Sequence, residues 1–475
     1  MIKALYTGAV INADGTFTFT ALDSSPKIIY VKGRISLNTN AAGTELTESD
    51  YACTGWSFED YKTAYNPKTW NRTLASNGKP ASPSGTLETA RSCSSNKQAA
   101  VVKLAVGSNT SILGLGSDAK IVHGQLSLPA GTDNVVIRNI TFEDAFDFFP
   151  LWDPTDSYNV DATYTYVAPP ATADATSTYP KCQYTYDATT DNGPHQCPGG
   201  RWNSNYDLLG LSGATHVWID HCTFTDGDRE TSKYPSVWKA PYIGHEYEVE
   251  HHDGLVDITL TSNFVTVSYN RVGHHQKAHL IGSSDTVTAA NGWGALSVTL
   301  HHNYYDEAGE RLPRVRMGKV HVYNNYYSGT FTPALSTPPY YGLSNPKDPD
   351  RPFIYGLGIG HLSKIYSENN VFEISARAGD AAVTQDALFW VWHKANPTSG
   401  LAAGEYTYFY DSGSTLNGAA TSLLTAANAK AATFGKPTLL STDTYWKPSS
   451  VYTYTAESAA SVKATVIAKA GAGKL

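Results

Sequence analysis

Six segments of this chain repeat one short pattern, and this repetition constrains the fold more than any other feature. In each segment apolar residues alternate with other residues, and a polar pair and often Asn and an aromatic residue follow. The segments are NVVIRNITF from Asn134, HVWIDHCTF from His216, FVTVSYNRV from Phe264, SVTLHHNYY from Ser297, KVHVYNNYY from Lys319 and KIYSENNVF from Lys364. Alternation with period two predicts strands, and self-similarity at a spacing of about 20 to 50 residues predicts a repeat architecture.

One coil per repeat predicts an all-β chain folded as a right-handed parallel β-helix, with neighbouring coils about 4.8 Å apart. The seventh positions of the six segments are Ile140, Cys222, Asn270, Asn303, Asn325 and Asn370. Asn at one repeated position is expected to form a ladder in which each side-chain amide bonds the next. An antiparallel sandwich is the alternative, but it gives no reason for Asn to recur at one register.

This register brings distant charged residues together. Asp257 lies 13 residues before Asn270, and Asp207 lies 15 before Cys222, so both are expected on the same preceding strand of neighbouring coils. Asp253 starts that strand or ends the turn before it. Three converging carboxylates repel one another unless a cation lies among them, and hard oxygen ligands favour Ca²⁺ over a transition metal.

A basic group is expected opposite these carboxylates. Lys277 is seven residues past Asn270, Arg311 is eight past Asn303, and Arg316 follows five residues later. The residues are therefore expected to form a cleft with one acidic and one basic side. The alternative is that they form solvated faces or weak surface ion pairs, which single pairs of this kind usually are.

Several longer runs resemble the signature blocks of polysaccharide lyase family 1, the pectate lyases. These runs are VWIDHCTFTDGD, DGLVDITLTSNFVTVSYNRVGHHQKAHLIG and ERLPRVRMGKVHVYNNYY. The resemblance covers the chain from about Lys27 to Leu475. It implies a secreted enzyme that cleaves polygalacturonate by Ca²⁺-dependent β-elimination and gives 4,5-unsaturated oligogalacturonides.

The resemblance also implies a role for each charged residue. Asp207, Asp253 and Asp257 match calcium ligands, Lys277 and Arg316 match residues that bind the substrate's uronate groups, and Arg311 matches the catalytic base. Asn205 stands where the family often has an acidic ligand. Two alternatives remain: a pectin lyase acting on methylated pectin without Ca²⁺, and a non-catalytic β-helix that binds acidic polysaccharide.

Arginine is an unusual base because its reference pKa is about 12.5 or above. Physical chemistry alone assigns Arg311 to electrostatic binding and would seek a lysine base; the resemblance is what assigns it proton abstraction. If that role holds, we expect an alkaline pH optimum.

Composition and cysteine usage bear on partners and location. A net charge of −8 disfavours nucleic-acid binding, and no apolar run is long enough to span a membrane. Cys222 is expected to be a buried free thiol, which leaves Cys53 with Cys93 and Cys182 with Cys197 as loop pairs. Disulfides imply an oxidising compartment, and we expect a secreted monomer whose export signal, and part of whose N-terminal cap, are missing from this sequence.

The whole chain, 1–475, is expected to be one β-helix domain. Residues 143–206, 226–252 and 328–360 are expected to be long loops that wall the binding groove, with Trp202 either lining a sugar subsite or packed in the interior. Helical patterns near Thr421–Thr433 and Ala456–Ala470 predict C-terminal helices that cap the solenoid. The Asp220–His221 pair is expected to be structural, and the paired histidines have no zinc-site spacing.

Overall fold

The six repeated segments stack as parallel strands in a computed structural model of this chain, which describes residues 1–65, 82–153, 201–229, 251–331, 352–394 and 404–475. In order, the strands are β9 (Asp133–Arg138), β14 (Thr215–Asp220), β17 (Asn263–Ser268), β20 (Ser297–His301), β23 (Lys319–Tyr323) and β27 (Lys364–Glu368). Each pairs in parallel with the next. We call this row the first wall; it confirms the predicted parallel β-helix.

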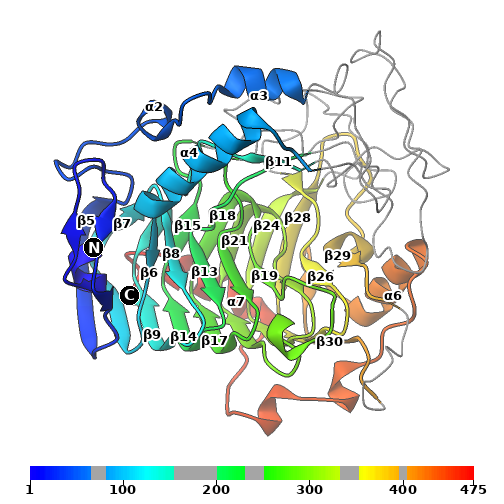
Figure 1. The fold of residues 1–475 in the computed structure, drawn as a ribbon. Helices are drawn as coiled ribbons and strands as arrows, with labels where there is room; N and C mark the ends of the chain where they lie inside the picture. Colours follow the sequence, from blue (N-terminus) through cyan, green and yellow to red (C-terminus); the bar gives the residue numbers. More distant parts are fainter. Residues whose placement is uncertain (66–81, 154–200, 230–250, 332–351, 395–403) are drawn as a thin grey trace.

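Two further rows of parallel strands complete each coil. The second wall contains β10 (Thr141–Glu143), β15 (Thr223–Thr225), β18 (Arg271–Lys277), β21 (Tyr304–Glu310), β24 (Tyr326–Phe331), β28 (Val371–Ala376) and β31 (Thr415–Leu416). The third wall is an eight-stranded sheet of β6 (Lys103–Ala105), β8 (Gln125–Leu128), β13 (Leu209–Ser212), β16 (Val256–Thr259), β19 (Leu280–Ile281), β22 (Arg314–Val315), β26 (Leu357–Ile359) and β29 (Phe389–Val391). Figure 1 shows these coils stacked along one axis from the N-terminal end.

Long strands and short elements close the two ends of the solenoid. At the N-terminal end β7 (Thr110–Val122) joins the first two walls, since it pairs with both β9 and β10, and β5 (Lys27–Ser36) pairs along it. At the other end β30 (Tyr408–Ser412) pairs with β27. Further short strands are β1 (Tyr6–Thr7), β2 (Val10–Ile11), β3 (Phe17–Thr18), β4 (Ala21–Leu22), β25 (Pro352–Phe353) and β32 (Ala419–Ala420).

The predicted asparagine ladder lies inside the turn between the first and second walls. The side-chain oxygen of Asn325 accepts hydrogen bonds from the backbone and side-chain nitrogens of Asn303 at 2.9 and 3.0 Å. Asn270 and Asn370 extend the same pattern to the neighbouring coils. The residue just before each ladder Asn has positive φ, as at His302 (56°), which turns the chain sharply and leaves backbone groups that the Asn side chains satisfy.

We expect Asn325→Leu to destabilise the fold by about 3 kcal/mol, because it removes the acceptor of two buried N–H groups of Asn303 and one of the two donors to the buried Asn370 Oδ1. Chemical denaturation measures this loss. Asn12→Ala is the control, since its bond to Thr16 lies in an exposed turn. Equal stability of the two variants would contradict the account of the ladder.

The interior is filled by inward-facing residues of all three walls. It forms one continuous apolar cluster running from Leu5 to Leu439. Stacked aromatic rings continue from coil to coil, as in Tyr305 on Tyr327 (4.7 Å between centroids) and Tyr327 on Phe372 (4.3 Å). Such a core is rigid, so residues at the corners of the coils have fixed positions.

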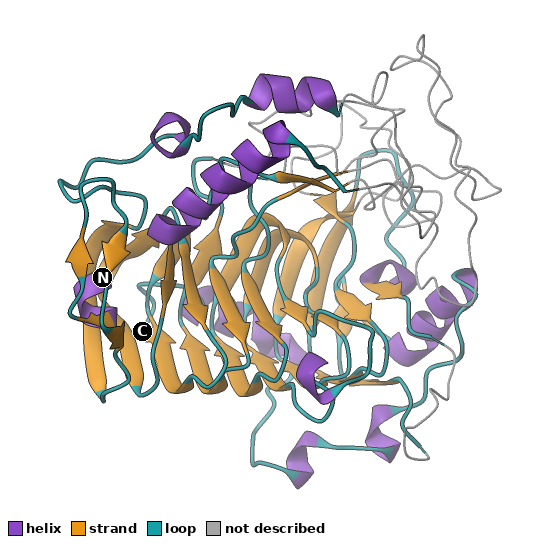
Figure 2. Cartoon of the chain, viewed as in Figure 1, coloured by secondary structure: helices purple, strands orange, loops and turns teal. Residues whose placement is uncertain are grey.

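The helices of the described residues lie on the outside of the solenoid (Figure 2). They are α1 (Ile2–Leu5), α2 (Glu48–Tyr51), α3 (Phe58–Ala64), α4 (Thr86–Val102), α6 (Leu423–Thr433) and α7 (Ala459–Lys469), with 3₁₀ turns η2 (Ala289–Asn291), η3 (Gln385–Leu388), η4 (Thr442–Thr444) and η5 (Pro448–Ser450). The two predicted C-terminal helices are present. Only α6 packs against the last coil, at β29 and β30, whereas α7 packs beside β24 and β28 along the solenoid, so the prediction that both cap it is wrong for α7.

The predicted loop insertions are partly strands. The ends of segment 143–206 pair as β11 (Leu151–Asp153) and β12 (Arg201–Asn203), and segment 328–360 contains β25, β26 and the last four residues of β24. The greater part of each of the three segments lies outside the described residues. No helix in the described part of the chain has the length and apolarity needed to cross a membrane.

The cysteine prediction is confirmed as far as the structure describes it. Cys53 and Cys93 form a disulfide that links the segment between α2 and α3 to α4, and Cys222 is a buried free thiol. Cys182 and Cys197 lie outside the described residues.

Candidate active site

Five of the six predicted site residues gather where the second wall passes into the third, and the sixth, Arg316, lies just past a strand of the third wall. Lys277 ends β18, Arg311 directly follows β21, and Asp257 lies in β16. Asp207 and Asp253 precede β13 and β16, and Arg316 follows β22. Because β13, β16, β19 and β22 are successive neighbours in one sheet, residues far apart in the sequence lie on successive coils.

The predicted register is correct for the coils and slightly wrong within them. Asp257 pairs with Gly210, so Asp207 lies three residues ahead, in the turn before β13, rather than on the same strand position. Lys277 pairs with Glu310, which puts Arg311 one residue further on. Counting residues from each charged residue to the ladder position predicted too close an alignment, because the turns included in the count differ in length.

Two carboxylates of the acidic group (Asp207, Asp253 and Asp257) converge on Gly254. The backbone N–H of Gly254 donates to Asp207 Oδ1 at 2.9 Å, and that of Leu280 donates to Asp257 Oδ1 at 3.0 Å. A Cβ at position 254 would come within 2.7 Å of Asp207 Oδ1 and 2.6 Å of Asp257 Oδ1. Only glycine leaves this space open between the two oxygens.

Burial, and after it repulsion within the acidic group, raises the carboxyl pKa values of Asp207 and Asp257. Burial and the neighbouring Asp257 and Asp253 raise the pKa of Asp207 well above its ordinary value. Burial and Asp253 raise the pKa of Asp257 to about 7, against the opposing effect of Arg311. Negative charge therefore accumulates here beyond what the surrounding protein compensates, and a bound cation would relieve it.

These oxygen donors suit a hard cation such as Ca²⁺. Asp253 Oδ1 is 3.2 Å from Lys277 Nζ, so the third carboxylate also faces the basic side. Within the described ranges no group of three or more His, Cys, Asp or Glu side chains is arranged so that it could hold a metal ion.

We expect Asp257→Asn to stabilise the metal-free protein, by an amount that grows between about pH 4 and pH 7. In this range the raised pKa means that the folded state binds more protons at Asp257 than the unfolded state does. Wild-type stability at this group therefore falls as pH rises, and Asn removes the loss. Thermal unfolding in chelator measures the difference; Asp133→Asn, at an exposed carboxyl, is the control. A difference that stays constant or shrinks with pH would contradict this.

Two members of the basic group (Lys277, Arg311 and Arg316) lie beside the acidic one, namely Lys277 and Arg311. Lys277 is 3% exposed. Arg311 Nε is buried without a hydrogen bond inside the described part of the chain, and Glu310 Oε1 lies 3.8 Å away. Arg316 Nε lies 2.7 Å from Asp285 Oδ1.

The two arginines differ in pKa. Burial acts to lower the Arg311 pKa, but Glu310, Tyr355 and Asp257 outweigh it and the pKa rises above its ordinary value. Burial and neighbouring Arg314 lower the Arg316 pKa to about 10. Arg311 can therefore act as a base only when charge on the carboxylates beside it is compensated.

Several residues around the site were not predicted. His275 bridges Asp226 Oδ1 at 2.7 Å and the backbone oxygen of Asp253 at 2.6 Å, which fixes the turn carrying that aspartate. Asp147 accepts from the Asn205 backbone at 3.0 Å. The place of His275 two positions before Lys277, on the same side of a strand, was the available signal; for Asp147 there was none.

The Asp220–His221 pair has the structural place that was predicted for it. Asp220 binds His221 at 2.7 Å and Ser268 at 2.6 Å within the first wall. Trp202 is fully buried against Trp152 and Tyr61, so of its two predicted roles the interior one is correct.

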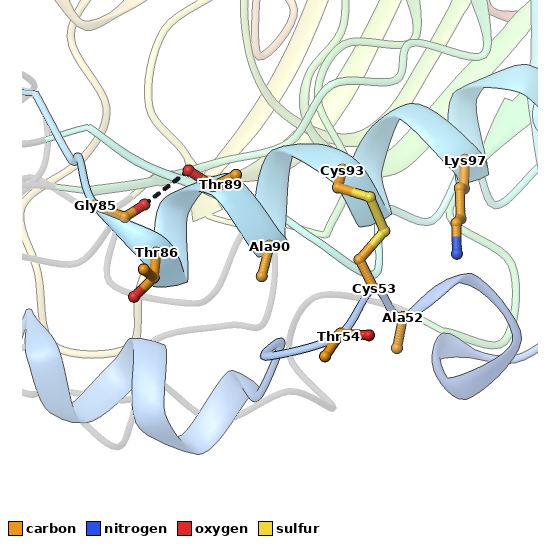
Figure 3. Close-up of a pocket in the computed structure, with 9 residues that line it drawn as sticks. All are labelled: Ala52, Cys53, Thr54, Gly85, Thr86, Thr89, Ala90, Cys93 and Lys97. Atoms are coloured by element: carbon orange, nitrogen blue, oxygen red, sulfur yellow. Dashed lines mark hydrogen bonds between the residues drawn. A yellow bond between two sulfur atoms is a disulfide. The ribbon is translucent and has the colours of Figure 1, made fainter.

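A separate hollow of about 820 Å³ lies beside the Cys53–Cys93 disulfide (Figure 3). Among the described residues, its walls are small or neutral side chains and the charged Lys97. It contains none of the acidic or basic group, and its chemistry does not match the predicted site.

Known proteins share this sequence and architecture. The pectate lyase family model matches residues 38–197 and 194–475. A pectate lyase of Bacillus subtilis is 37% identical over 453 residues, covering 95% of this chain and 83% of the relative. The solved pectate lyase of Acidovorax avenae subsp. citrulli has a TM-score of 0.80 at 36% identity, covering 100% of this chain and 88% of that one. A pectate lyase bound to a hexasaccharide has a TM-score of 0.70 at 35% identity over 95% of this chain and 88% of its own.

Proposed function

The chain belongs to the pectate lyase family, and from this membership we propose that it cleaves α-1,4-linked polygalacturonate by Ca²⁺-dependent β-elimination. The observation that carries the proposal is the convergence of Asp207 and Asp257 on open space at Gly254, with Lys277 and Arg311 on the adjoining coils. In β-elimination a base takes the C5 proton and the C4–O glycosidic bond breaks. The electron pair of the C5–H bond becomes the 4,5 double bond, and the leaving oxygen acquires a proton.

Asp207, Asp253 and Asp257 would hold the calcium ion. Bound Ca²⁺ supplies positive charge against the uronate carboxylate of the reacting sugar and so stabilises the charge that develops there. Oxygens of the substrate would complete the ligand set. Asn205 contributes no charge, so we propose no further acidic ligand at that position.

The basic group acts on the substrate directly. Lys277 and Arg316 bind uronate carboxylates and orient the chain, as cationic side chains with several donors can. Arg311 accepts the C5 proton. Its pKa is raised by the carboxylates around it, and compensation of their charge lowers that pKa towards the working range. The reaction should therefore be fastest at alkaline pH.

We also propose that the protein works outside the cell as a monomer. The Cys53–Cys93 disulfide is typical of an oxidising compartment, and a polymeric plant-wall substrate is reached only there.

Substrate preference tests the proposed function. The initial rate of unsaturated product, followed by ultraviolet absorbance, should be much higher on polygalacturonate than on highly methylated pectin, because the methyl ester removes the charge that Lys277 and Arg316 bind. Preference for the methylated polymer would instead assign the chain to pectin lyase chemistry. Binding without product would assign it to a non-catalytic carbohydrate-binding role.

A further inference from the structure

A buried tryptophan lies against two arginines at the far end of the candidate cleft. Trp392 directly follows β29 and is 3% exposed. The guanidinium carbon of Arg314 is 4.3 Å from the centre of its ring, and that of Arg316 is 5.5 Å away. Both arginines belong to the segment that follows Arg311, yet they contact a residue of a coil two strands away, because β26 lies between β22 and β29.

Two glycines make this contact across β26 possible. A Cβ on Gly358 would come within 3.1 Å of both Arg314 Cα and the Trp392 ring. A Cβ on Gly360 would come within 2.8 Å of the Trp392 ring and 2.9 Å of Arg316 Cγ. The two glycines thus leave space beside β26, and in this space the arginines contact the tryptophan.

The arginines need such a support because they repel each other. Burial and Arg314 lower the Arg316 pKa, and Arg316 is held by Asp285 and by the Gly282 carbonyl at 3.2 Å. Arg314 Nε is buried and makes no hydrogen bond within the described residues. The face of an indole attracts a guanidinium and also excludes water from one side of it.

We infer that Trp392 is a positioning residue that holds Arg314 and Arg316 side by side as one cationic position for a substrate carboxylate, beyond the reacting sugar. Trp392 is too buried to stack on a sugar itself, so it acts through the arginines. Planar guanidiniums bind carboxylates with two parallel donors, and their orientation determines whether both donors can be used. This inference rests on the proposed function and adds Arg314 and Trp392 to it.

Kinetics of Trp392→Leu on polygalacturonate test the inference. The loss of the ring should raise KM about tenfold, the range of a desolvated cation–π contact, with kcat within about twofold. Trp392→Phe keeps an aromatic face and should recover most of the loss. Trp218→Leu is the matched control: it removes a tryptophan beside Arg138 in the first wall, where the guanidinium carbon lies 5.8 Å from the ring, and should leave KM unchanged.

A second variant covers the case in which Trp392→Leu does not fold. Arg314→Lys keeps the charge but loses the planar contact, so it should raise KM by a similar factor. In the Trp392→Phe background it should have a smaller effect than alone, since the two residues act through one contact. If the wild type turns over polygalacturonate and the variants have the same KM, or differ in kcat only, the inference is overturned. A wild type without turnover would remove the proposed function and the inference with it.

Discussion

Arg311→Lys should lower kcat on polygalacturonate by about a thousandfold, while KM changes by no more than about threefold. Lysine keeps the positive charge but is shorter and lacks the guanidine nitrogens. Arg311 is placed directly after β21 with φ of 61°, so its side chain leaves the corner in a fixed direction. The loss corresponds to about 4 kcal/mol of transition-state stabilisation.

Initial rates measured at saturating substrate report kcat, and they therefore separate this effect from a change in substrate binding. Arg271→Lys is a suitable control, because Arg271 pairs with Asp306 at the opposite end of β18 and lies outside the cleft. If Arg311→Lys retained more than a tenth of the wild-type kcat, Arg311 would be an electrostatic binding residue and the base would have to be sought elsewhere.

Asp257→Asn should reduce kcat/KM by at least about a hundredfold at fixed calcium, and higher calcium should restore only part of it. The substitution replaces one carboxylate oxygen of Asp257 by an NH₂ group, which cannot ligate a cation, and it removes the negative charge beside Gly254. The same substitution is expected to stabilise the metal-free fold, as argued above from its raised pKa. A residue whose removal improves stability and abolishes function is one kept for its chemistry.

Calorimetric titration with Ca²⁺ in the presence of trigalacturonate measures the binding part directly. Wild type should bind the ion, and Asp257→Asn should bind it much more weakly, whereas Asp133→Asn should resemble wild type. An Asp257→Asn variant with full activity and unchanged calcium affinity would remove this residue from the metal site.

The sequence predicted the fold because its evidence is repeated in every coil. Asn303, Asn325 and Asn370 recur at one position, and each makes the same hydrogen bonds to the next. A repeat of this kind averages over local irregularities. The positions of Asp207 and Arg311 within their coils depend on single turns instead, and there the prediction was off by three residues and one residue.

Contacts that are possible only because glycine has no side chain could not be predicted. Nothing in the sequence says that Gly254 separates two carboxylates or that Gly358 and Gly360 make room for Trp392. Pairing partners such as Asp285 for Arg316 are likewise set by loops whose course has no periodic signal. Residue types in the site were thus accessible from sequence, while their spacing and support required the structure.

The most direct test of the account is the rate of ultraviolet absorbance increase on polygalacturonate at alkaline pH, with chelator and after adding Ca²⁺ back. The account predicts a rise that chelator stops and calcium restores, because elimination produces a 4,5-unsaturated sugar only when the charge of Asp207, Asp253 and Asp257 is compensated. A rise that continues unchanged in chelator would contradict the calcium-dependent site.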